Sequence, residues 1–150
     1  MGRKLVLLIV ALALTGTVAA VAEQAWPKTP PAPAGAVDAP FSFVVLGDNR
    51  PGGAGSPVPP VYIAALQSIN ATTAQFVINT GDIISGSTDL TVMNQQLDDF
   101  IAATEVLGVP CYVAYGNHEL RSAECLQVLE QRIGPSYCAF SHGNSRVYVL

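Results

Sequence analysis

The pattern of apolar and polar positions along the chain predicts three buried strands. Short, nearly continuous apolar runs occupy residues 41–46, 76–80 and 109–115. Runs of this length and composition are typical of parallel strands that are covered on both faces. A further pair of strands, 137–140 and 146–150, is expected to form a hairpin around the Gly-Asn pair at 143–144.

Helices are predicted between these strands, because apolar residues recur there every three or four positions. The expected helices span residues 61–70, 90–107 and 120–133. The side chains expected to be buried on them are Tyr62, Leu66 and Ile69, then Met93, Leu97, Phe100, Ile101 and Thr104, and then Leu126, Leu129 and Ile133. Strands that alternate with helices and are followed by a hairpin predict an α/β layered fold.

The N-terminal region has a different composition and is not expected to belong to this fold. Residues 1–22 begin with Arg3 and Lys4, continue as an apolar run and end in small residues, which is the pattern of a secretory signal peptide. The alternative is an uncleaved membrane anchor, but the run is short for a span of roughly 20 apolar residues. Residues 23–40 are rich in Pro and Ala and predict an extended linker, so the folded domain is expected at 41–150.

Composition and charge narrow the class of protein. The 150 residues are 50% hydrophobic, which suits one globular domain, and the formal net charge is −4. Cleavage of the signal peptide would remove Arg3 and Lys4 and make the mature chain more acidic. An acidic chain is a poor partner for nucleic acid or anionic lipid, and it needs a local positive centre, such as a metal ion, to bind an anionic substrate. We therefore expect an exported protein, secreted or periplasmic, with no nucleic-acid surface and no stable membrane anchor after cleavage.

The three cysteines leave two alternatives open. In an oxidising compartment Cys125 and Cys138 could form a disulfide, or all three thiols, including Cys111 in the third predicted strand, could be free and buried.

Polar motifs follow each of the three predicted strands. The first strand runs into Gly-Asp-Asn-Arg (47–50), the second into Gly-Asp (81–82) and the third into Gly-Asn-His-Glu (116–119). In parallel α/β sheets, ligands bind beyond the carboxyl ends of the strands. All three motifs are therefore expected at the ligand-binding edge of the sheet.

The side chains of these motifs indicate a metal site. Asp48, Asp82, Asn117 and His118 are all oxygen or nitrogen donors. Carboxylates that are grouped without basic partners repel one another unless a cation lies between them. Oxygen-rich ligation favours hard or borderline divalent ions.

In this order and on successive strand ends, the three motifs resemble those of calcineurin-like metallophosphoesterases. The resemblance covers residues 41–150 and implies the N-terminal half of a β-sandwich flanked by helices, with a centre of two divalent ions (Mn, Fe, Zn or similar). It implies that Asp48 binds the first ion, that Asp82 bridges both, and that Asn117 binds the second and faces the phosphoryl group. His118 is then the general acid in phosphoester hydrolysis by a metal-activated hydroxide. The substrate would be a small-molecule or macromolecular phosphoester.

The sequence departs from the family pattern at several positions. Arg50 stands where many members have a histidine ligand, and since a guanidinium cannot ligate a metal, Arg50 is predicted to bind the phosphate. Ser85 stands where some members have an aspartate that orients the catalytic histidine, and a hydroxyl, which can hydrogen-bond an imidazole, stabilises an imidazolium less than a carboxylate does. Glu119 is expected only to begin the third helix, and His142 to be an exposed turn residue.

Only two histidines, His118 and His142, occur in the whole sequence, while the family draws further histidine ligands from later motifs. We therefore expect these 150 residues to be the N-terminal part of a longer protein, with a truncated domain that is inactive or nearly so by itself. Two hypotheses follow: a metal-dependent phosphoester hydrolase, or a non-catalytic extracellular binding module on the same scaffold.

Overall fold

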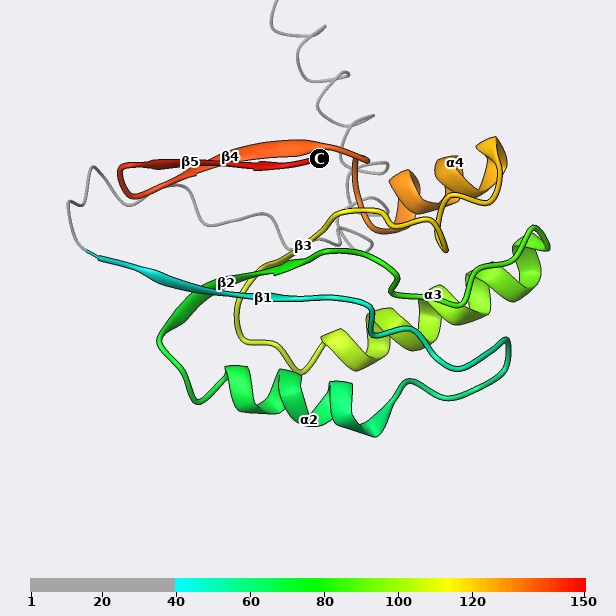
Figure 1. Ribbon diagram of the computed structural model, residues 1–150, viewed down its shortest axis with the longest axis horizontal. Helices are drawn as coiled ribbons and strands as arrows, with labels where there is room; N and C mark the ends of the chain where they lie inside the picture. The colour runs from blue at the N-terminus through cyan, green and yellow to red at the C-terminus, as the bar shows by residue number, and fades with distance from the viewer. Residues whose placement is uncertain (1–39) are drawn as a thin grey trace, which may run out of the picture.

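A parallel three-stranded sheet forms the centre of the molecule in the computed structural model, which describes residues 40–150 (Figure 1). Strands β1 (Ser42–Leu46), β2 (Ala74–Asn79) and β3 (Cys111–Val113) lie in the order β1-β2-β3. The predicted signal peptide and nearly all of the predicted linker lie outside the described residues.

Helices cover one face of this sheet and a hairpin covers part of the other (Figure 1). The helices are α2 (Pro60–Ile69), α3 (Leu90–Thr104) and α4 (Ala123–Arg132). The antiparallel hairpin consists of β4 (Cys138–His142) and β5 (Ser145–Val149). The prediction of an α/β fold with a parallel sheet flanked by helices is confirmed.

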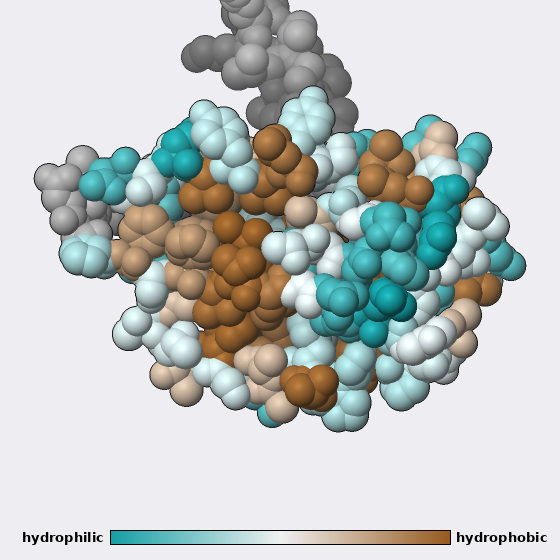
Figure 2. All heavy atoms as spheres, viewed as in Figure 1, coloured by the Kyte–Doolittle hydropathy of each residue, from teal (hydrophilic) through white to brown (hydrophobic). Residues whose placement is uncertain are grey.

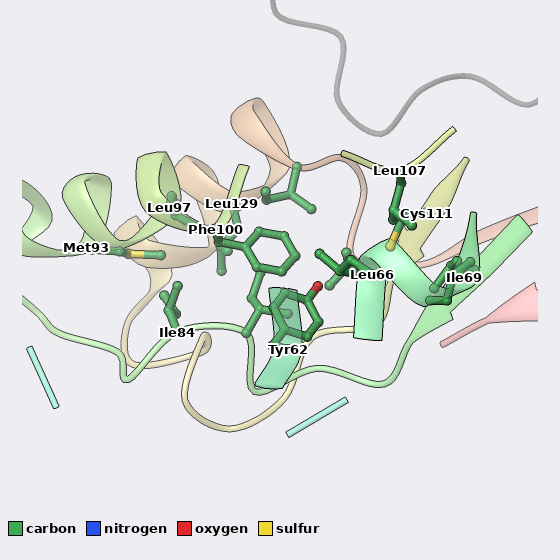
Figure 3. Packing of buried hydrophobic residues seen from close by; sticks show 14 of the residues in the cluster. Tyr62, Leu66, Ile69, Ile84, Met93, Leu97, Phe100, Leu107, Cys111 and Leu129 are labelled. Atoms are coloured by element: carbon green, nitrogen blue, oxygen red, sulfur yellow. The ribbon is translucent and has the colours of Figure 1, made fainter. Parts of the chain in front are cut away.

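The larger core lies between the sheet and the helices (Figure 3). The three apolar positions predicted for α2 are all buried, and on α3 only Ile101 is less buried than expected, while Gln96 is buried in addition. The aromatic rings of Tyr62 and Phe100 stack with centroids 6.2 Å apart. Regular spacing of apolar residues was therefore sufficient to predict the packed faces of these two helices.

The smaller core joins the sheet to the hairpin. Phe76 of β2 and Tyr112 of β3 pack against Phe140 and Val149 of the hairpin. The rings of Tyr112 and Phe140 stack at 4.0 Å, and Phe76 meets Phe140 edge to face at 5.2 Å.

Strand β1 is not covered on both faces, so this part of the prediction is wrong. Phe43 is 45% exposed and Val45 is 56% exposed, and Figure 2 shows a hydrophobic patch over β1. The reason is that the buried sheet residues under the hairpin come from β2 and β3, so the hairpin leaves this face of β1 open.

The third helix begins later than predicted, at Ala123 instead of residue 120. Ser122 caps it, because the side-chain oxygen of Ser122 accepts a hydrogen bond from the backbone N–H of Cys125 at 3.2 Å. As a consequence Cys125 is buried, whereas Leu126 is only half-buried.

His142 is not an exposed turn residue. It ends β4 and is half-buried, with its ring 4.8 Å from that of Phe41 and 5.2 Å from that of Phe76. Its Nε2 atom lies 2.5 Å from Oε1 of Gln75. The turn predicted at residues 143–144 does connect the two strands, but His142 packs onto the sheet before the turn begins.

All three cysteines are free thiols, with Cys111 and Cys125 buried and Cys138 half-buried. Burial raises the pKa of Cys111 to about 12, which keeps this thiol protonated and unreactive. In residues 40–150 there is no helix with the length and apolarity that crossing a membrane requires.

Candidate active site

Backbone hydrogen bonds hold together the three loops that follow β1, β2 and β3. The N–H of Asp48 donates to the carbonyl of Gly81 at 2.9 Å, which joins the first loop to the second. The N–H of Ala114 donates to the carbonyl of Asn79 at 2.8 Å, which joins the second strand end to the third. The structure thus brings the three predicted motifs to one edge of the sheet. In Figure 2 a hydrophilic surface lies beyond the carboxyl end of β1.

Asp48 and Asp82 share an unusual backbone conformation. Their φ angles are 51° and 53°, and they are the non-glycine residues with positive φ in the part of the chain that the structure describes. A left-handed conformation costs a residue with a side chain about 1–2 kcal/mol, and such strain is concentrated at functional sites. Because both aspartates adopt this strained conformation at equivalent strand ends, we infer a functional role for their carboxylates.

The glycines of the second and third motifs allow their loops to touch. A Cβ atom on Gly81, whose φ is 98°, would lie 2.5 Å from the backbone nitrogen of Gly116. A Cβ atom on Gly116 would lie 2.2 Å from Oδ1 of Asp82. Since neither approach leaves room for a side chain, only glycine fits at both positions.

Arg50 lies between the two aspartates. Its Nε atom is 3.5 Å from Oδ1 of Asp48 and 3.9 Å from Oδ2 of Asp82. These distances allow ion pairing, but the buried Nε has no hydrogen-bond partner. One cationic group therefore lies between the two carboxylates, and its Nε–H is hydrogen-bonded to neither.

The His118 ring is oriented by a backbone carbonyl. Its Nδ1 atom lies 2.7 Å from the carbonyl oxygen of Ser85, whereas the Ser85 hydroxyl donates to the carbonyl of Pro51. The contact of Ser85 with the ring is therefore made by its backbone carbonyl and not by its hydroxyl. Because a carbonyl only accepts, the network assigns the hydrogen to Nδ1 and leaves Nε2 as the free ring nitrogen. Nη2 of Arg121 lies 3.0 Å from the same Nδ1, and this second donor cannot bond a nitrogen that carries its own hydrogen.

The Asp82 side chain connects the loop after β3, which carries His118, to the loop after β1, which carries Arg50. Its Oδ1 accepts the backbone N–H of His118 at 3.2 Å, and its Oδ2 faces Arg50. Asn117, between Gly116 and His118, is exposed. Asp48, Asp82 and Arg50 thus form one connected group, which the backbone of His118 joins through Asp82.

Glu119 has a role that the sequence prediction missed. It does not begin a helix: it is fully buried and accepts hydrogen bonds from four backbone N–H groups in the second and third loops. One signal was present in the sequence, because a carboxylate three residues after Gly116 has the spacing at which Glu reaches back to a backbone N–H in a capping box. The three N–H donors in the second loop could not be predicted, because no sequence pattern near Glu119 points to them.

Asn79 is a second residue that sequence reasoning did not identify. It is fully buried at the end of β2, where its Oδ1 accepts from the N–H of Gly81 at 3.0 Å and its Nδ2 donates to Oδ1 of Asn49 at 2.8 Å. These bonds fix the orientation of both amides and tie the first loop to the second. The same Nδ2 lies 3.5 Å from the Tyr62 hydroxyl, whose pKa burial raises well above its usual value.

The residues present suit part of a divalent metal site. Asp48 and Asp82 converge on a single cationic nitrogen, so a metal ion in place of that nitrogen would have two hard oxygen ligands. Within residues 40–150, no three His, Cys, Asp or Glu side chains are arranged to hold a metal ion. The described carboxylates are therefore a ligand pair and not a complete coordination shell.

The sequence matches the model of a known protein family. A sequence model described as calcineurin-like phosphoesterase matches residues 40–146, which include β1 through most of the hairpin and all three motifs. No match was found among curated proteins or among solved structures. The family match supports phosphoester hydrolysis at the level of the family.

Proposed function

Because the chain belongs to the calcineurin-like phosphoesterase family, we propose that the full-length protein hydrolyses phosphoesters with two divalent ions at the strand edge that carries Asp48 and Asp82. The observation that carries this proposal is the convergence of both carboxylates on Nε of Arg50, next to the loop of His118. Asp48 would hold the first ion, Asp82 would bridge both ions, and Asn117 would hold the second.

When bound, such ions supply a polarised phosphoryl oxygen and a water acidic enough to act as a hydroxide nucleophile near neutral pH. Arg50 would bind a phosphoryl oxygen through its guanidinium, whose buried Nε–H has no hydrogen-bond partner. This assignment uses the same atom that pairs with the carboxylates, so substrate binding is expected to draw the guanidinium away from Asp48.

His118 acts as the general acid at the leaving oxygen. The Ser85 carbonyl holds the hydrogen on Nδ1 and stabilises the doubly protonated ring, so Nε2 is the nitrogen that donates its proton to the departing alkoxide. A histidine ring can both bind and release a proton, as a general acid must in each turnover.

The test is a hydrolysis assay of the full-length protein with an aryl phosphate and added Mn²⁺. Asp82→Asn and His118→Ala are each expected to lower kcat by about 100-fold or more, since each removes a group that acts on the developing charge. Arg50→Ala is expected to raise KM about tenfold, equivalent to roughly 1.4 kcal/mol of binding. Glu105→Gln is the control, because Glu105 lies at the far end of α3. If Asp82→Asn and His118→Ala left kcat unchanged, the assignment would be wrong.

The alternative is a non-catalytic binding module on the same scaffold. It is favoured by the position of Arg50, whose guanidinium already neutralises the two carboxylates. Elemental analysis separates the two: a folded full-length protein that retains no divalent ion would support the binding module and exclude the hydrolase.

We also propose that the protein is exported, on the basis of the signal-peptide pattern of residues 1–22. N-terminal sequencing of the mature protein is expected to begin at Glu23, and an intact Met1 on membrane-bound protein would contradict cleavage.

A further inference from the structure

Glu119 is a buried carboxylate whose partners are backbone N–H groups. Its Oε2 accepts from Asp82 at 2.9 Å and from Gly116 at 2.7 Å. Its Oε1 accepts from Ile83 at 2.8 Å and from Ile84 at 3.2 Å. The side chain has 0% exposure. Burial of a carboxylate is costly unless its charge is compensated, and here four donors supply that compensation.

These bonds join two loops that contribute different functional groups. Three of the donors belong to consecutive residues of the loop after β2, beginning with Asp82, and the fourth belongs to Gly116 in the loop after β3. The bond to Asp82 is made by the residue whose φ is 53°. Glu119 therefore holds the strained backbone at Asp82. It also fixes the position of His118, which directly precedes it in the chain.

We propose that Glu119 is a positioning residue that sets the distance between the Asp82 carboxylate and the His118 ring, and that a carboxylate is required at this position. Each of its oxygens accepts two N–H groups, so all four acceptor sites are used. An amide of the same shape has one oxygen and one NH₂ group, and in either orientation the NH₂ group faces two N–H donors. The catalytic part of this inference rests on the proposed function.

Replacement of Glu119 is expected to weaken metal binding at Asp82. Partners that orient a metal ligand typically affect metal affinity or activity 10- to 100-fold when they are removed. Glu119 acts on the backbone of Asp82 and not on Arg50, so substrate affinity is expected to change little. A merely structural role would reduce the amount of folded protein without changing metal affinity or kcat of the folded fraction.

The decisive comparison uses full-length protein with Glu119→Gln, and with Leu129→Ala as a control that is destabilised in the core but loses no group of the four Glu119 hydrogen bonds. Leu129 is buried at 0% exposure on α4. Below the unfolding temperature of both variants, Glu119→Gln is expected to weaken Mn²⁺ binding, followed by electron paramagnetic resonance, by 10- to 100-fold. It should lower kcat by a similar factor and leave KM within about threefold, while Leu129→Ala should change neither quantity per folded molecule.

A second measurement covers the case in which the isosteric variant folds poorly or the wild type binds no Mn²⁺. Glu119→Asp retains the charge but is one methylene shorter, and amide hydrogen exchange in the metal-free protein reports the four N–H groups without turnover. Selectively faster exchange at residues 82, 83, 84 and 116, with unchanged exchange in the helices, supports the positioning role. Uniform changes across the chain, or Mn²⁺ affinity equal to that of Leu129→Ala, would overturn it. A wild-type protein without Mn²⁺ binding or hydrolysis would overturn the proposed function, and the exchange data alone would then decide the role of Glu119.

Discussion

The loops after β2 and β3 differ from the loop after β1 in how firmly they are held. Glu119 and the paired glycines lock the β2 and β3 loops to each other, and the Asp82 side chain is only 21% exposed. The Asp48 side chain is 79% exposed and has Arg50 as its ion-pair partner, while the loop that follows it is rich in Gly and Pro.

This difference separates two tasks. The firmly held half positions Asp82 and His118, the general acid of the proposed function, where a displacement of about 1 Å would reduce the rate severely. The open half carries Arg50, which under the proposed function exchanges its carboxylate partners for a phosphoryl oxygen. Substitutions in each half would show whether the two halves differ in stability as they do in geometry.

The largest difference in unfolding free energy is expected between two glycine-to-alanine variants, one in each half. Gly116→Ala puts a methyl group 2.2 Å from Oδ1 of Asp82, so the loops must separate, and we expect a loss of about 3 kcal/mol in unfolding free energy. Gly52→Ala meets nothing within 4 Å and is the matched control, with little or no loss. Urea unfolding of both variants measures the difference, and equal losses would mean that the β2 and β3 loops are no more constrained than the β1 loop.

A smaller effect is expected at the link between the two halves. Asn79→Ala removes the acceptor of the buried Gly81 N–H and the donor to Asn49, which should cost roughly 2 kcal/mol because a buried group is left unpaired. The exposed Asn144 is the control, and Asn144→Ala should be close to neutral. If the two variants unfold at the same urea concentration, Asn79 does not tie the loops together.

The smallest effect is expected at the exposed ion pair. In metal-free protein Asp48→Asn should change the unfolding free energy by less than about 0.5 kcal/mol, since an exposed pair 3.5 Å apart is screened by solvent. Asp82→Asn should cost more, about 1 kcal/mol, because this carboxylate also accepts the N–H of His118. Urea unfolding in the presence of a chelator measures both variants, and a larger loss for Asp48→Asn would reverse the comparison.

The sequence predicted those features that depend on local spacing. The buried face of α2 follows from the recurrence of Tyr62, Leu66 and Ile69, and the α/β class follows from the order of strands and helices. The position of the site at the strand ends follows from a general rule for parallel sheets. None of these inferences needs knowledge of contacts between distant residues.

The features that were missed depend on partners far away in the sequence. Glu119 was expected only to begin a helix, because its donors in the β2 loop lie more than thirty residues earlier, as the separation of 37 from Asp82 shows. The exposure of Phe43 and Val45 depends on where the hairpin packs. Which nitrogen of the His118 ring carries the hydrogen depends on the carbonyl of Ser85. Such contacts are properties of the folded chain and leave no periodic pattern.

The most direct test of the central claim is anomalous X-ray diffraction from crystals of the full-length protein soaked in Mn²⁺. We predict an anomalous peak within ligand distance of the carboxylates of Asp48 and Asp82, lost in Asp82→Asn crystals. A wild-type protein with Arg50 still between the two carboxylates and no peak at this edge of the sheet would contradict the account.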